Sequence, residues 1–171
     1  ELKTALARGD DISSSAVLLR VNANAAMLIR ILDSKAVPYC HLGRSPDICS
    51  HFIFKDIYAY VNAARYFKRG DIIRIVNKPV RYISHASFKF SDGEPFISMR
   101  KYYKGKPRMI ESVNQLYSDL KTINRLTPYA AFRYITGAVG YKSYLKSFAT
   151  EKHVDYSVFE DILIEIGDIF K

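Results

Sequence analysis

Hydrophobic residues recur at steps of three and four along most of the chain after residue 44. This spacing is typical of an α-helix that buries one face. The stretches with this spacing are 53–64, 109–123, 132–135 and 159–170. Each is preceded by a proline or by a side-chain oxygen, both of which favour a helix start. The pattern therefore predicts a helical region over residues 45–171.

The ends of these helices are also predicted. The expected helix starts are Ser45-Pro46-Asp47, Pro107, Thr127-Pro128 and Asp155. Gly70 is expected to end the first helix, because glycine adopts the left-handed conformation found there. A short helix is expected from Asp71 to Val76, and turns at 77–79 and 91–95.

Residues 1–44 have a different pattern. The segments 16–21 and 37–40 are short and apolar, and a helical stretch lies between them. A strand, a helix and a strand of this length predict a parallel β-α-β unit, whose partner strands must come from elsewhere. Because the first residue is Glu1, we expect the chain to be a piece of a longer protein. The predicted fold class is mainly α, with a helical domain over residues 45–171 and a small β-α-β fragment over residues 1–44.

Positive charge is concentrated in one part of the chain. The formal net charge is +9, and residues 65–108 carry 12 Lys and Arg against 3 Asp and Glu. The charges before and after this segment nearly balance. Such a segment attracts polyanions, and nucleic acid is the first candidate. The alternative is a basic face that is merely solvated.

Other classes of protein are disfavoured by the composition. No apolar run approaches the roughly 20 residues that cross a bilayer, and the start does not resemble a signal peptide. Two cysteines do not make a disulfide framework, so we expect reduced thiols in the cytoplasm and no membrane partner.

Four potential metal ligands lie close together in the sequence, namely Cys40, His41, Cys49 and His51. Adjacent residues of a strand point to opposite faces, so Cys40 and His41 do not converge easily. The spacing fits no common zinc signature, and we expect no metal site.

Three stretches, in order, resemble the UvrD/Rep-type superfamily-one DNA helicases. The first is 16–24, AVLLRVNAN, followed by Val37-Pro38-Tyr39, which is similar to a strand, helix and strand of the second motor domain, 2A. The second is 54–63, FKDIYAYVNA, followed by 73–79, IRIVNKP, where family members enter the accessory domain, 2B. A weaker third match covers 126–145. The resemblance implies that residues 1–44 are a fragment of 2A and that residues 45–171 are 2B.

The function that the resemblance implies is the DNA-binding region of an ATP-dependent 3′-5′ helicase. Domain 2B grips duplex DNA ahead of the fork and regulates unwinding. The chain has no G-x-x-x-x-G-K-[ST] loop. We therefore expect no catalytic residue, no cofactor and no ATP hydrolysis in this fragment, while the parent would use ATP and Mg²⁺. Expected partners are duplex DNA or a single/double-strand junction, and the remainder of the helicase chain.

Two other functions stay open. One is a regulatory or protein-interaction module of a helicase-like protein that has lost its duplex grip. The other is a helicase–nuclease fusion of the same superfamily.

The predicted DNA-binding turn runs from Lys78 to Ser84. It aligns with the family's PKRGIG turn, which offers backbone N–H groups to a phosphate. Lys78 and Arg81 are the predicted phosphate contacts. Tyr82 and Ser84 stand where the family has glycines. Either the turn still forms, with Ser84 as hydroxyl donor and helix cap, or the grip has moved.

A second basic cluster is also predicted to bind DNA. Its main residues are Arg100, Lys101 and Lys104, followed by Lys106 and Arg108. Tyr102 and Tyr103 lie among them. Their rings could stack on unpaired bases, but packing under Lys and Arg stems is the favoured interpretation.

Arg20 and Asn22 match an R-T-N element of the motor domain. Arg20 belongs either to that motif or to a structural ion pair. The family's basic residue a few positions on aligns with Ala26, which argues against a single-strand contact from this helix.

His85 and His153 have no acidic or nucleophilic partner at a spacing typical of a catalytic site, so we expect neither to be catalytic.

Overall fold

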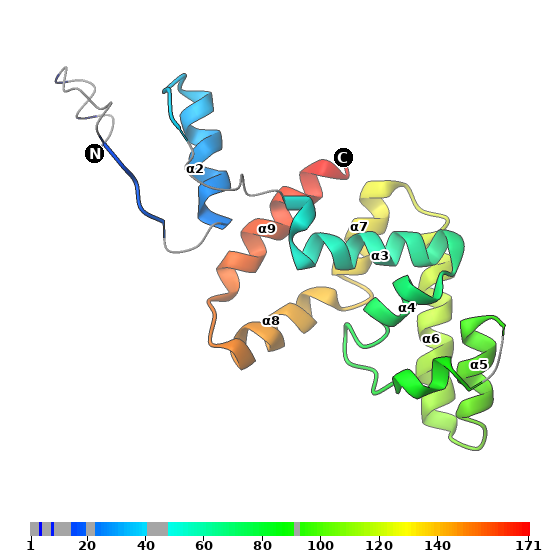
Figure 1. Cartoon of the computed structure of the whole chain (residues 1–171). Coiled ribbons are helices and arrows are strands. Elements are labelled where there is room, and N and C mark those ends of the chain that lie inside the picture. Colours follow the sequence, from blue (N-terminus) through cyan, green and yellow to red (C-terminus); the bar gives the residue numbers. More distant parts are fainter. Residues whose placement is uncertain (1–3, 5–7, 9–14, 20–22, 41–47, 91–92) are drawn as a thin grey trace. The chain divides into compact units, whose positions relative to one another are not determined.

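The computed structural model describes residues 4, 8, 15–19, 23–40, 48–90 and 93–171. The chain divides into two compact units, Glu1–Pro46 and Asp47–Lys171 (unit 1 and unit 2; Figure 1). Every regular element among the described residues is a helix. The prediction of a mainly α protein is therefore confirmed.

Unit 1 contains the helix α2 (Ala23–Ser34) but not the predicted strands. Residues 15–19 and 37–40, on either side of it, have no regular secondary structure. The prediction of a β-α-β fragment is wrong for these residues, because a strand is completed by hydrogen bonds to a neighbour and none of the described residues supplies one. Leu18 is 95% exposed as a result.

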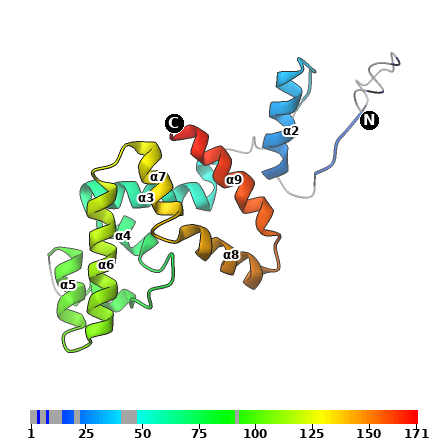
Figure 2. The ribbon, with the colours of Figure 1, turned by 180° about the vertical axis from the view of Figure 1, so that it is seen from behind.

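Unit 2 is built from eight elements around the long helix α3 (Phe52–Tyr66). The others are η1 (Ile48–Ser50), α4 (Arg69–Ile75), η2 (His85–Phe88), α5 (Pro95–Tyr102), α6 (Pro107–Ile123), α7 (Pro128–Thr136), α8 (Tyr141–Lys152) and α9 (Tyr156–Ile169). Helix α3 contacts α4, α6, α7 and α9 and is covered from several sides (Figures 1 and 2). It buries Ile53, Ile57 and Tyr60 with two alanines, Ala63 and Ala64.

Three predicted helix starts agree with the structure. Prolines stand at the start of α6 and α7, and Asp155 caps α9 by accepting a hydrogen bond from the Ser157 N–H at 2.9 Å. These are local signals, contained within one helical turn. The start predicted at 45–47 lies outside the described residues.

Two helix boundaries differ from the prediction. Helix α3 ends before Gly70, because Phe67 takes the left-handed conformation (φ 50°) and caps the helix through Ala63. Its ring packs against Phe96 and Tyr117, at centroid distances of 5.9 and 5.8 Å. Helix α5 was not predicted at all. At Phe67 a tertiary contact outweighs the local signal, whereas α5 begins at a local signal, Pro95, in a segment predicted to be a turn.

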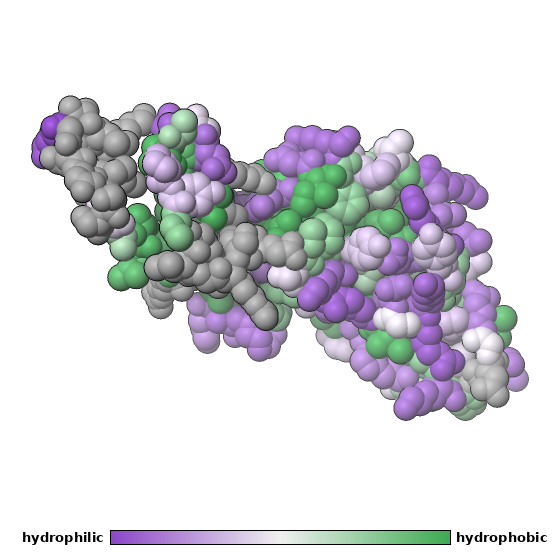
Figure 3. Space-filling view, turned by 45° about the horizontal axis from the view of Figure 1, so that its top comes forward, coloured by the Kyte–Doolittle hydropathy of each residue, from purple (hydrophilic) through white to green (hydrophobic). Residues whose placement is uncertain are grey.

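The surface of unit 2 is mixed. Hydrophilic residues prevail on the face drawn in Figure 3, with smaller hydrophobic patches between them. Among the helices that the structure describes, none has the length and apolar character required to span a membrane.

Candidate nucleic-acid interface

The turn after α4 is closed by the side chain of Asn77. Its Nδ2 donates to the Ile83 carbonyl at 2.8 Å, and its Oδ1 accepts from the N–H of Ile83 at 2.9 Å and of Arg81 at 3.4 Å. Ile83 is buried beneath the turn, and the Lys78–Pro79 peptide is cis. The Asn77 amide therefore ties Arg81 and Ile83 back to the start of the turn.

Lys78 is drawn inward by a buried carboxylate. Its Nζ lies 2.9 Å from both oxygens of Asp56, a fully buried residue of α3. The same carboxylate accepts from Arg74 Nε and from Tyr141 Oη, each at 2.8 Å. Burial raises the pKa of Tyr141, and the neighbouring Asp56 raises it further, so this hydroxyl stays protonated as a donor. Asp56 thus joins α3, α4, the turn and α8.

Arg81 is even less accessible, with a side chain only 9% exposed. Its Nη1 donates to the carbonyl oxygens of Val76 and Pro79, both at 3.3 Å, and its Nη2 lies 3.8 Å from Asp119. The Tyr60 hydroxyl, 3.4 Å from the guanidinium, donates to the Lys78 carbonyl at 2.6 Å. Burial raises the pKa of Tyr60, and nearby Arg81 opposes this rise.

These contacts give Lys78 and Arg81 a structural role. Guanidinium and ammonium groups that neutralise buried carboxylates are less available to an external phosphate. The N–H groups of Arg81, Ile83 and Ser84 are also occupied within unit 2. Contact of Lys78 or Arg81 with DNA stays a prediction.

The outer side of the turn carries different residues. Val80 is 58% exposed and Tyr82 is 83% exposed, with Tyr82 at φ 55°. Ser84 is exposed and begins η2, where its Oγ accepts from the Ala86 N–H at 3.2 Å. The turn therefore points Arg81 and Ile83 inward and Val80, Tyr82 and Ser84 outward.

The second basic cluster lies beside this turn. We call residues 100–108 the basic loop; it covers the end of α5 and the start of α6. The Tyr103 hydroxyl accepts from the Ser84 N–H at 2.7 Å, although 19 residues separate them. This bond joins the basic loop, which contains the predicted contacts Lys101 and Lys104, to the turn at Ser84.

The basic loop carries five positively charged side chains. Among residues that the structure describes, no acidic group forms a salt bridge with its five cations, which are Arg100, Lys101, Lys104, Lys106 and Arg108. Four of these are exposed; Arg100 is held by Asn114 at 2.9 Å and lies over the Tyr117 ring at 5.0 Å.

The tyrosines of the loop pack rather than project. Tyr103 is buried, and its ring meets that of Tyr102 edge-on at 4.9 Å. Tyr102 also packs edge-on against Phe90 at 5.5 Å. The two rings therefore pack against aromatic neighbours, while packing under Lys and Arg stems stays a prediction.

None of the other candidate residues that the structure describes is part of the turn or of the basic loop. Arg20, Asn22 and His41 are outside the described residues. Cys40, Cys49, His85 and His153 are exposed. His51 caps α3, its Nδ1 accepting from the Ile53 N–H at 3.3 Å, and burial lowers its pKa.

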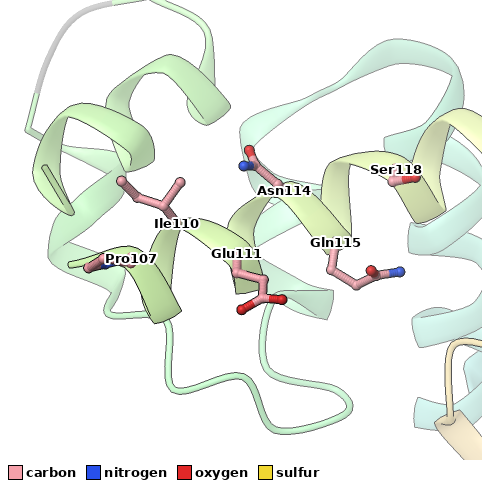
Figure 4. A pocket seen from close by; sticks show the side chains of 6 residues that line it. All are labelled: Pro107, Ile110, Glu111, Asn114, Gln115 and Ser118. Atoms are coloured by element: carbon pink, nitrogen blue, oxygen red, sulfur yellow. The ribbon is translucent and has the colours of Figure 1, made fainter. Parts of the chain in front are cut away.

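Grooves lie on the described surface of unit 2 along α6 and between α7 and α9. One, of about 610 Å³, follows the outer face of α6, where Asn114 points away from Glu111 and Gln115 (Figure 4). Its lining residues all come from that one helix. The other, of about 410 Å³, runs between α7 and α9 over Phe132 and Leu163.

The buried acids are the residues that the sequence interpretation missed. Asp56 falls on the hydrophobic stripe of α3, between Ile53 and Tyr60, and Asp119 falls likewise between Leu116 and Ile123 on α6. An acidic residue on a hydrophobic stripe that is buried requires a basic partner. This pattern could have predicted the buried ion pairs from the sequence.

Comparison with known proteins gave no match: no family model, no curated protein and no solved structure matches the chain. The functional interpretation therefore depends on the resemblance of short stretches and on the geometry described above.

Proposed function

We propose that residues 45–171 are a DNA-binding accessory domain, similar to domain 2B of the UvrD/Rep-type helicases. It would grip duplex DNA ahead of the fork in a cytoplasmic, ATP-driven 3′-5′ helicase and regulate unwinding. The observation that carries this proposal is the basic loop, whose cations lack acidic partners in the described part of the chain and adjoin an exposed turn.

In this proposal the two parts of the surface have different roles. Lys101, Lys104 and their neighbours contact phosphates, which gives salt-dependent binding with little sequence preference. Lys78 and Arg81 hold the turn in shape through Asp56 and Asp119. In this proposal the DNA-binding residues are therefore those of the basic loop and no longer Lys78 and Arg81 of the turn.

Residues 1–44 would belong to the second motor domain of the same parent. The segments 15–19 and 37–40 would then pair with strands of that motor, which would bury side chains such as Leu18. ATP and Mg²⁺ would bind elsewhere in the parent, and this chain alone would not hydrolyse ATP.

The proposal is tested by the salt dependence of duplex binding. Fluorescence anisotropy with a labelled duplex is measured over a range of salt concentrations for the wild type and for Lys101→Gln/Lys104→Gln. The slope of log K against log salt should fall by about 0.9 for each phosphate contact removed. Lys142→Gln, an exposed lysine of α8, is the matched control and should leave the slope unchanged. A wild type without salt-dependent affinity for DNA refutes the proposal.

The second candidate function is a regulatory or protein-interaction module. It is favoured by the internal use of Lys78, Arg81 and three backbone N–H groups of the turn. A wild type that binds neither DNA nor heparin would support this alternative.

A further inference from the structure

Tyr82 combines three properties that folding alone does not explain. Its side chain is 83% exposed, its backbone has φ 55°, and it stands at the tip of a turn. A non-glycine residue with positive φ is strained, and an exposed ring gains little from burial. Glycine would meet the backbone requirement at lower cost. Strain of this kind, held in place by its surroundings, is a feature of functional sites.

The surroundings hold this tip firmly. Residues on both sides of Tyr82 are anchored, Arg81 by carbonyl oxygens and Asp119, and Ile83 by burial and by Asn77. Ser84 is tied to α5 through Tyr103. Val80, also exposed, adds a second apolar group on the outer side. Little of the tip's backbone freedom is left to be lost on binding.

We propose that Tyr82 stacks on an unpaired nucleobase at a junction between single- and double-stranded DNA. This inference rests on the proposed DNA-binding function and names the part of the DNA that the turn contacts. Unpaired bases present their flat faces to an aromatic ring, whereas bases inside a duplex are covered by their neighbours. The basic loop, next to Ser84, holds the phosphate backbone while the ring meets the base.

An apolar pocket of a protein partner would also accept an exposed tyrosine. The basic loop favours DNA, because it is joined to the turn at Ser84 and its exposed lysines Lys101 and Lys104 would be desolvated without acidic partners in an apolar pocket. Close to a phosphate backbone the same charges are stabilising.

The test compares junction DNA with closed circular duplex DNA, which has no ends. The junction carries 2-aminopurine at its first unpaired position, because the fluorescence of this base reports stacking. We expect the wild type and Tyr82→Phe to quench the probe. Tyr82→Gly should not quench it and should lose about five- to tenfold in junction affinity, while its affinity for closed duplex is unchanged.

Tyr82→Gly also controls for folding. Because glycine accepts positive φ, its urea midpoint should stay close to that of the wild type, so a loss of binding does not reflect unfolding. Junction affinity and quenching that survive in Tyr82→Gly overturn this inference and leave the proposed function standing. Equal losses on both DNAs overturn it as well. A wild type that binds neither DNA refutes the proposed function itself.

Discussion

Removal of the buried carboxylate of Asp56 is the sharpest test of how unit 2 is held together. In Asp56→Asn the side chain keeps its shape but loses its charge. The new amide NH₂ group is itself a donor, so it would face groups that also donate and could not accept from them. Arg74, Lys78 and Tyr141 are the groups that lose a charged acceptor. They lie on α4, in the turn after it, and on α8, so the substitution affects three connections at once.

The magnitude follows from what each donor can do afterwards. Removing one partner of a buried ion pair costs about 3–5 kcal/mol. Arg74 and Lys78 reduce this cost, because their side chains are 37% and 27% exposed and can turn to water. The buried hydroxyl of Tyr141 has no such outlet, and an unsatisfied buried donor costs about 1–3 kcal/mol. We expect the free energy of unfolding to fall by about 3 kcal/mol.

The assay is urea unfolding of the full chain, followed by circular dichroism at 222 nm. Tyr141→Phe, which removes one hydrogen bond to the carboxylate, should cost about 1.5 kcal/mol. The double variant should cost less than the sum of the two, since both act on one interaction. Asp161→Asn, an exposed aspartate of α9, is the matched control and should change stability by less than about 0.5 kcal/mol.

Two results would contradict this reasoning. A loss below about 1 kcal/mol for Asp56→Asn would mean that apolar packing alone holds α4 and α8 against α3. Strict additivity of Asp56→Asn and Tyr141→Phe would show that the two groups do not interact in the folded protein.

Three further outcomes are expected. Burial lowers the pKa of His51 below its ordinary value of 6.5, so the His51 imidazole binds a proton less readily in the folded protein than in the unfolded chain. The contribution of His51 to stability should therefore be complete above pH 6.5 and decline as the pH falls below it. His51→Asn keeps a capping side chain, so it should flatten this decline in thermal melts measured at a series of pH values. Arg81→Met should lower the urea midpoint while leaving the salt slope of DNA binding unchanged; a smaller slope would instead place Arg81 at the phosphates. Gly70→Ala should stabilise the protein by roughly 0.5–1 kcal/mol, because the added Cβ meets nothing within 4 Å and α4 is already helical there; a lower melting temperature would show that the glycine is required.

The sequence alone determined the features that depend on neighbouring residues. The starts of α6, α7 and α9 follow from Pro107, Pro128 and Asp155, because capping and the fixed φ of proline act within one turn. The mainly α class follows from the three- and four-residue spacing of buried side chains. The concentration of positive charge in residues 65–108 was also evident without any structure.

Only the tertiary structure decided the features that join distant residues. Segments 15–19 and 37–40 have strand-like sequences but form no strand, because pairing requires a neighbour that local pattern does not supply. Lys78 forms an ion pair because Asp56, 22 residues earlier in the chain, is buried on α3 and lies within reach of it. The bond from Ser84 to Tyr103 places two separate predicted clusters side by side. Burial decides which charges are used inside the protein and which face outward, and burial is set by the packing of all the helices together.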